Sequence, residues 1–427
     1  MISSKRALAL TLAFGGTAAA TPALAQYQTP APAPQQQIQQ PAADAPAEAP
    51  GRKYDLSNAA RKAIIELQAA VNAKDVATIP AKLAAAKAVQ KTTDDKFVIA
   101  QFQLKAAVDA KDEAGITAGI EAMLASGGVS QADTLPLYSN LGRQYYKAKQ
   151  FDQAGTAFER VLQLNPNDTD AMAMLAETRK AQGRVPDAVA LLQKGIAARV
   201  AAGQKPSEDW YKRAVALAYE AKLPAAVSLS RDWVAAYPTP SNWRDTLRIY
   251  KNSSGLDADV VIDLLRLQRA AGALAGETDY YNYASFVLLK GFPGEAKAVL
   301  DEGFAAKSID RSKPIFREVY AQASGKTAAD RASLPGLEKT ALASPAAKQA
   351  MITGDAYLGY SDYAKAAALY RAALTKSGVD TSLANLHLGM ALARSGDKAG
   401  ATTALNAVTG VRTDIAKYWL IWLSTRA

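Results

Sequence analysis

From Asp55 onward, apolar residues recur at the three- and four-residue spacing of amphipathic α-helices. Ile64, Ile65, Leu67 and Val71 are predicted to share one stripe of the first such segment, which begins after Ser57, a residue type that caps helices well. The same pattern predicts three further short helices over 79–89, 97–108 and 114–124, separated by turns at Lys74-Asp75, Asp94-Asp95 and Lys111-Asp112. These segments predict two degenerate helical hairpins, and Gly127-Gly128 breaks the last helix.

A more regular pattern of large and small residues follows. It comprises Tyr138, Leu141, Gly142, Tyr145, Ala154, Phe158, Val161 and Pro166. Gly142 and Ala154 are small enough to let two helices approach closely, while Tyr145 and Phe158 fill the space beside the crossing. Pro166 ends the second helix because proline cannot continue a helical hydrogen-bond ladder.

This pattern resembles the tetratricopeptide repeat family, whose unit is a helix–turn–helix of about 34 residues. Eight units follow one another at spacings of about 34 to 38 residues, starting at Leu135, Thr169, Ser207, Ser241, Glu277, Arg311, Ala347 and Ser382. The sixth unit is divergent, because Glu318 and Asp330 occupy its small-residue positions. Within that unit, Gly325-Lys326-Thr327 lacks the earlier glycine of a phosphate-binding loop and is predicted to be an interhelical turn.

The resemblance implies an all-α fold, a right-handed superhelical solenoid of about ten helical hairpins. The predicted organisation is a signal peptide (1–25), a disordered linker (26–53), degenerate hairpins (54–134), tetratricopeptide-like repeats (135–412) and a capping helix (413–427). Apolar residues of the last segment, including Trp419 and Trp422, would cover the final hairpin. The alternative is an exposed helix that docks on a partner or a membrane surface.

The amino terminus has the features of an export signal. Lys5 and Arg6 precede an apolar run over 7–20, and Ala23-Leu24-Ala25 offers a cleavage site. The alternative is an uncleaved anchor. The Pro/Gln/Ala-rich stretch that follows lacks core-forming residues and predicts a disordered spacer. We therefore expect a periplasmic protein of the Gram-negative type, or a secreted one, with no membrane span in the mature chain.

Composition limits the possible chemistry. The chain has 50 Lys and Arg, 40 Asp and Glu, one His and no Cys, and its formal charge of +10 becomes +8 once Lys5 and Arg6 are removed. The positive charge suits acidic segments or envelope polyanions rather than nucleic acid, which an exported protein does not meet, or it serves only solubility. Without cysteine, thiol catalysis is excluded, and His387 alone cannot build a usual zinc site. We predict no enzymatic activity, no cofactor and no metal, with His387 at the surface or in the packing.

The resemblance also implies a binding surface. In tetratricopeptide proteins the first helix of each hairpin lines the concave groove, and the corresponding positions here are Arg143, Tyr146, Lys147, Lys180, Tyr211, Tyr219 and Tyr281. Tyrosine and arginine are enriched at interaction hot spots. The alternative is that these are ordinary solvated or half-packed positions. The Lys/Asn carboxylate clamp of co-chaperone repeats is not matched, because Ser139 and Arg143 occupy two of its positions.

Two hypotheses for function follow. The first is a non-catalytic periplasmic scaffold that binds protein segments in its groove, within cell-envelope assembly or polymer export. The alternative is a module that binds envelope glycans or polyanions through its basic and tyrosine-rich surface. An enzyme whose site carries no recognisable motif is the weakest of the three interpretations.

Overall fold

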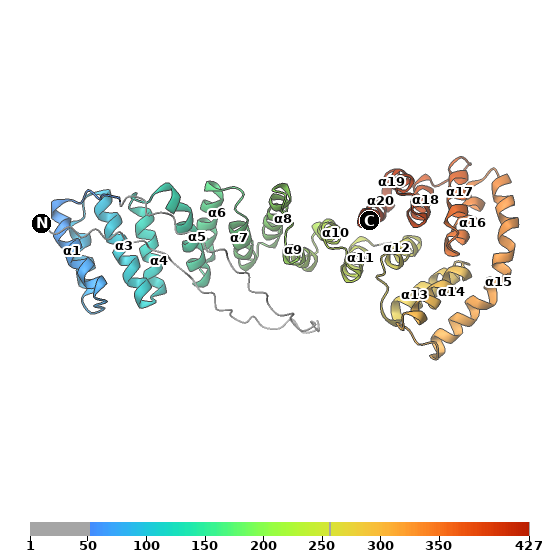
Figure 1. Ribbon diagram of the computed structural model, residues 1–427, viewed down its shortest axis with the longest axis horizontal. Coiled ribbons are helices and arrows are strands. Elements are labelled where there is room, and N and C mark those ends of the chain that lie inside the picture. The colour runs from blue at the N-terminus through green and yellow to red at the C-terminus, as the bar shows by residue number, and fades with distance from the viewer. Residues whose placement is uncertain (1–51, 256–257, 427) are drawn as a thin grey trace. The chain divides into compact units, whose positions relative to one another are not determined.

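A computed structural model describes residues 52–255 and 258–426, with the side chains of 258 and 259 excepted (Figure 1). The predicted signal peptide and almost all of the predicted linker lie outside these residues. The regular secondary structure of the described part consists of helices and one isolated bridge between Ala346 and Ser377. The described part divides into two compact units, the first ending at Leu137 and the second beginning at Tyr138. None of its helices is both long and apolar enough to cross a membrane.

The helices are short, and almost all of them pack against their neighbours in sequence. In order they are α1 (Asn58–Asn72), α2 (Ile79–Val89), α3 (Thr93–Ala110), α4 (Glu113–Ala125), α5 (Gln131–Lys147), α6 (Phe151–Leu164), α7 (Thr169–Ala181), α8 (Val185–Ala201), α9 (Glu208–Glu220), α10 (Ala225–Ala236), α11 (Pro240–Ser254), α12 (Ala258–Ala270), α13 (Gly276–Leu289), α14 (Pro293–Ala305), α15 (Pro314–Ala343), α16 (Ala347–Gly359), α17 (Tyr363–Leu374), α18 (Thr381–Ser395), α19 (Lys398–Asn406) and α20 (Thr413–Ser424). A short 3₁₀ turn, η1 (Gly410–Arg412), precedes α20. The predicted boundary between residues 134 and 135 falls inside α5.

The first unit contains the pairs α1/α2 and α3/α4. Ser57 caps α1, as predicted, by accepting a hydrogen bond from the amide of Ala60. The predicted turn at Asp94-Asp95 is wrong, because both residues lie in the first turn of α3. The buried Asp95 carboxylate closes a capping box with Thr92 and accepts from Ser57 Oγ at 2.6 Å. Burial would raise its pKa, but these hydrogen bonds outweigh it and lower the pKa to about 2.

A common turn joins the two helices of each pair in the described chain. One residue in each of the nine turns has a positive φ: Lys74, Lys111, Lys149, Gly183, Lys222, Gly255, Gly291, Ser361 or Gly396. A residue in the left-handed conformation ends a helix and reverses the chain sharply. Repetition of this turn explains why the elements form successive antiparallel hairpins, as the resemblance implies.

Within hairpins, the predicted glycines lie at close helix crossings. A Cβ built on Gly142 would lie 2.7 Å from a ring carbon of Phe158, which is the aromatic residue of the same repeat. A Cβ built on Gly354 would lie 2.7 Å from the Tyr370 ring, and one built on Gly389 would lie 2.6 Å from the Leu405 side chain. The steric explanation given for the repeat pattern is therefore confirmed in the first, seventh and eighth units.

The sixth repeat is not a hairpin. The structure replaces it with α15, a single helix of 30 residues that runs through the predicted turn at Gly325-Lys326-Thr327 (Figure 1). Thr327 Oγ1 donates to the carbonyl of Ala323 one turn earlier, and Gly325 has open space around it. The chain therefore forms nine hairpins in its described part, with α15 between the seventh and the eighth.

The C-terminal helix α20 does more than cover the last hairpin. It packs on α18 and α19 and also returns to α10 and α12, so the C-terminus lies beside helices much earlier in the chain (Figure 1). The Tyr418 ring lies 5.4 Å from that of Tyr250, and Trp422 Nε1 donates to the carbonyl of Ala270 at 3.0 Å. Arg231 of α10 pairs with Asp414. The helices α10–α12 and α16–α20 consequently share one apolar core.

Candidate functional site

The first helices of three successive hairpins bring polar and aromatic side chains together. We call this set the first-helix surface and define it as Arg143, Tyr146 and Lys147 of α5, Glu177 and Lys180 of α7, and Arg213 of α9. Glu177 and Arg213 form an ion pair at 3.1 Å. Burial raises the pKa of Tyr146, Glu177 raises it further and Arg213 opposes the rise, so all three groups lie close enough to interact.

Beside this ion pair lies a hollow of about 220 Å³. It is lined by Ala173, Leu192, Ser207, Asp209, Trp210 and Arg213. The Trp210 ring is held in place, because Arg199 stacks over it at 5.0 Å and Gly195 leaves room for it on α8. A Cβ on Gly195 would lie 2.3 Å from the Trp210 ring. The hollow therefore has a fixed aromatic wall and a charged rim, and it is large enough for one side chain of a partner.

The structure separates the predicted groove residues into two groups. Arg143, Lys147 and Lys180 are exposed, and Tyr146 is half-buried with its ring edge-on to Phe151. These four lie on the first-helix surface.

The other three tyrosines lie elsewhere. Tyr211 is buried, with 4% exposure, and packs edge-on against Tyr237 inside the α9/α10 hairpin, so it does not line an open groove. Tyr281 is half-buried against Phe316. Tyr219 is exposed, and its hydroxyl accepts a hydrogen bond from Asn252.

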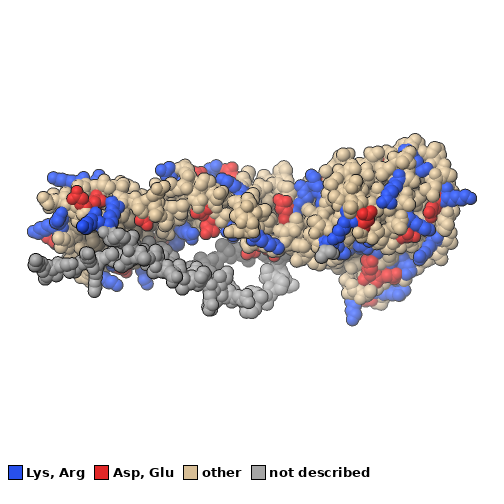
Figure 2. Space-filling model, turned by 45° about the horizontal axis from the view of Figure 1, so that its top comes forward, with Lys and Arg blue, Asp and Glu red and all other residues tan. Residues whose placement is uncertain are grey.

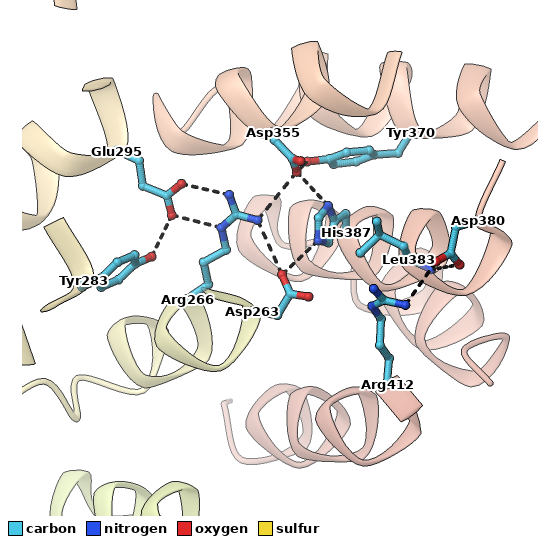
Figure 3. Close-up of polar contacts among 10 residues, drawn as sticks. All are labelled: Asp263, Arg266, Tyr283, Glu295, Asp355, Tyr370, Asp380, Leu383, His387 and Arg412. Atoms are coloured by element: carbon cyan, nitrogen blue, oxygen red, sulfur yellow. Dashed lines mark hydrogen bonds and ion pairs between the residues drawn. The ribbon is translucent and has the colours of Figure 1, made fainter. Parts of the chain in front are cut away.

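A second cluster, which the sequence did not predict, lies buried in the C-terminal part of the chain (Figure 3). Arg266 of α12 donates from Nε and Nη2 to the two carboxylate oxygens of Glu295 at 3.0 and 2.9 Å. Its Nη1 lies 3.6 Å from both Asp263 and Asp355. Four helices (α12, α14, α16 and α18) supply the charged groups of this buried network.

His387 completes the buried network. Its Nε2 lies 2.9 Å from Asp263, and its Nδ1 forms an ion pair with Asp355 at 2.7 Å whose angle departs from that of a hydrogen bond. Burial would lower the pKa of His387, but Asp355 and Asp263 outweigh it and raise the pKa to about 9. The sole histidine is therefore a packing residue rather than a surface residue, and it is protonated at neutral pH.

The buried network has the composition of a structural element. Both ring nitrogens of His387 face carboxylates at ion-pair distance. In the described residues no group of three or more His, Cys, Asp or Glu side chains is arranged to hold a metal ion. Asp263 and Arg266 interrupt an otherwise apolar stretch of α12, and this is the signal in the sequence that could have revealed them.

Two segments of the chain match models of a known protein family. Residues 145–202 and residues 353–412 each match a family model described as tetratricopeptide repeat. The first segment contains most of the first-helix surface, and the second contains Asp355 and His387. This chain contains tetratricopeptide repeats. No curated protein matches the sequence.

Several solved structures resemble this chain weakly. A TPR2AB domain of yeast Sti1 in a complex with pHSP90 has 13% identity and a TM-score of 0.25, covering 66% of this chain and 91% of that one. A tetratricopeptide repeat protein from Parabacteroides merdae has 11% identity and a TM-score of 0.27, covering 79% and 100%. Naa15/Naa10 bound to HypK-THB has 14% identity and a TM-score of 0.29, covering 82% and 63%.

Proposed function

We propose that this protein is a non-catalytic scaffold that binds segments of partner proteins on its first-helix surface. Tetratricopeptide repeats support protein–protein interaction in general. The observation that carries the proposal is the hollow beside the Glu177–Arg213 pair, with Trp210 fixed in its wall. A rigid aromatic wall loses little conformational entropy on binding, which is why such pockets become hot spots.

The partner segments are acidic and carry an apolar anchor. Arg143 and Lys180 are exposed on neighbouring first helices, and the apolar wall of Ala173, Leu192 and Trp210 in the hollow suits one uncharged side chain. Figure 2 shows basic side chains over the visible face with acidic ones among them. That mixture favours a segment recognised side chain by side chain. A glycan or other polyanion would instead bind a continuous basic field.

The cellular setting in this proposal is the periplasm, within cell-envelope assembly or polymer export. Lys5, Arg6, the apolar run after them and Ala23-Leu24-Ala25 support export with cleavage after Ala25. Amino-terminal sequencing of the native protein tests this part separately. A mature chain that begins at Gln26 supports export, and one that begins at Met1 excludes cleavage.

The binding proposal is tested by selecting peptides from a random displayed library on the mature chain. We expect enrichment of peptides with Asp or Glu around one aromatic or aliphatic residue. The double variant Arg143→Glu/Lys180→Glu should lose these peptides because it reverses the charges that face them. Its stability should change by only about 0.5 kcal/mol, since both side chains are exposed.

The matched control reverses two exposed charges on second helices, Arg160→Glu/Lys194→Glu on α6 and α8. It makes the same change in net charge and should keep the selected peptides. Equal loss in both double variants would show non-specific attraction, as the polyanion alternative expects. Unchanged binding in Arg143→Glu/Lys180→Glu would rule out the first-helix surface as the binding site.

A further inference from the structure

A small cavity lies next to the buried network, away from the first-helix surface. Its volume is about 30 Å³, and it is lined by Arg266, Arg269, Tyr283, Glu295, Leu358, Tyr363, Met390, Arg394 and Trp419. Helices α12, α13, α14, α16, α17, α18 and α20 all contribute to it. Because a water needs about 10–15 Å³ by this measure, the cavity has room for roughly two oxygen-sized groups.

The three arginines that line the cavity are compensated unequally. Arg266 is neutralised by the carboxylates of the buried network, and Arg269 donates to both oxygens of Glu302, at 2.9 and 2.6 Å. Arg394 differs. Its Nε and Nη2 both donate to one neutral phenol, Tyr363 Oη, at 3.1 and 2.9 Å. Within the described chain Arg394 has no carboxylate partner.

Trp419, which also lines the cavity, carries a donor that has no acceptor in the described part of the chain. Trp419 is only 1% exposed, and its indole Nε1 has no hydrogen-bond partner among the described residues. An unsatisfied buried N–H costs roughly 1–3 kcal/mol, so native proteins rarely leave one without an acceptor. The neighbouring Trp422 shows the usual outcome, since its own Nε1 donates to the carbonyl of Ala270.

We propose that this cavity binds one carboxylate group, which accepts hydrogen bonds from Trp419 Nε1 and from the Arg394 guanidinium. A carboxylate has two oxygens and no donor, which matches two donors and room for about two oxygens. A primary amide of the same shape is disfavoured, because its NH₂ group would face these donors. A tetrahedral sulfate or phosphate has four oxygens and exceeds the volume. The carboxylate comes either from a small carboxylic acid or from an acidic side chain of a partner segment.

The test follows the indole N–H resonances of the full mature chain labelled with ¹⁵N-tryptophan, which contains five tryptophans. Sodium acetate is titrated against sodium chloride at equal ionic strength. We expect one indole resonance to move downfield with saturation, and Trp419→Phe should remove that resonance. Acetamide should leave it in place. A blocked tripeptide with a central Glu, and its Gln counterpart, then distinguish a partner segment from a small acid as the source.

The variant Arg394→Gln keeps Trp419 and should weaken acetate binding by about tenfold or more, because it removes a charge-assisted hydrogen bond. Arg371→Gln, an exposed change on α17, is the matched control and should bind like the wild type. Saturable shifts with acetate or with the Glu tripeptide, reduced by Arg394→Gln alone, support the proposal. No saturable shift, an equal shift with acetamide, or unchanged affinity in Arg394→Gln would overturn it and assign the cavity to water.

Discussion

His387 and Asp263 are 124 residues apart in the chain, yet the imidazole Nε2 lies 2.9 Å from the carboxylate Oδ1, and both side chains are buried. Asp355 contacts the other ring nitrogen at 2.7 Å. The pair joins α12 to α18, with the helices α13 to α17 between them in the sequence. It acts with α20 to hold the C-terminal helices in one core, so its protonation state is linked to the stability of that core.

The first prediction concerns alkaline pH. The folded pKa of His387 is about 9, above the ordinary value of 6.5, so its contribution to stability is fully present below pH 6.5. It is lost as pH rises through 9, and the shift corresponds to roughly 3 kcal/mol. Arg266 and Tyr370, which face the same site, stay protonated over this range because their pKa values are raised.

The measurement is denaturant unfolding followed by tryptophan fluorescence between pH 6 and pH 9.5. All five tryptophans lie in the second compact unit, so the signal reports on that unit. Stability should fall across this range in the wild type, and His387→Gln should be less stable at pH 6 with a flatter profile. A wild-type profile that is flat up to pH 9.5 would show that the histidine is neutral in the fold.

A second prediction compares two arginines on α12. Arg266→Met leaves Glu295 buried without its cation and leaves Asp263 and Asp355 with His387 alone, and breaking such a buried ion pair costs about 3–5 kcal/mol. Arg269→Met removes a pair whose carboxylate, Glu302, is half exposed, and should cost about 1 kcal/mol or less.

The two variants have the same change in composition and lie one helical turn apart, so each controls for the other. The free energy of unfolding is measured for both in urea. Equal costs would mean that the buried network contributes no more than a surface ion pair.

The repeat glycines, unlike the buried network, could be predicted from the sequence. Gly142 and Phe158 belong to one 34-residue unit, so a local spacing rule reveals their contact. The buried network joins distant units, and spacing carries no information about it. The failure at α15 has a similar cause, because Gly325 is compatible with both a turn and a helix. Only packing with the neighbouring helices decides between them.

The same limit applies to the candidate site. Arg143, Tyr146, Lys147 and Lys180, four of the predicted groove residues, lie on the first-helix surface, and their role in binding stays a prediction. Tyr211 was assigned to the groove by the same register but is buried, because α9 turns that position toward Tyr237. Arg213, which pairs with Glu177, was not among the predicted residues. A register inferred from small residues shows which helices cross. It does not show toward which neighbour the polar residues of each helix point.

A third prediction uses two glycines with opposite surroundings. Gly142→Leu should destabilise the protein by about 1–3 kcal/mol or more, because even a Cβ there would lie 2.7 Å from Phe158. Gly325→Ala, at an exposed position in the middle of α15, should stabilise it by about 0.4–1 kcal/mol, since alanine restricts the unfolded chain and meets nothing in the fold. Thermal unfolding of both variants shows whether the first is less stable and the second more stable than the wild type. A stable Gly142→Leu protein, or a destabilised Gly325→Ala protein, would contradict the crossing at Gly142 or the continuity of α15.

The last prediction asks what α20 holds together. If it only covered the final hairpin, loosening it would expose α18 and α19 alone. The Trp422 ring is 4% exposed and its Nε1 bonds to Ala270 of α12, so Trp422→Ala should cost about 3–5 kcal/mol and loosen both sides of the shared core. Amide hydrogen exchange should therefore accelerate in α10–α12 as well as in α18–α19, while α5–α8 keep their protection. Val411→Ala, a change at a side chain with 73% exposure in η1, is the control and should leave exchange unchanged. Faster exchange confined to α18–α19 would reduce α20 to the simple cap that the sequence predicted.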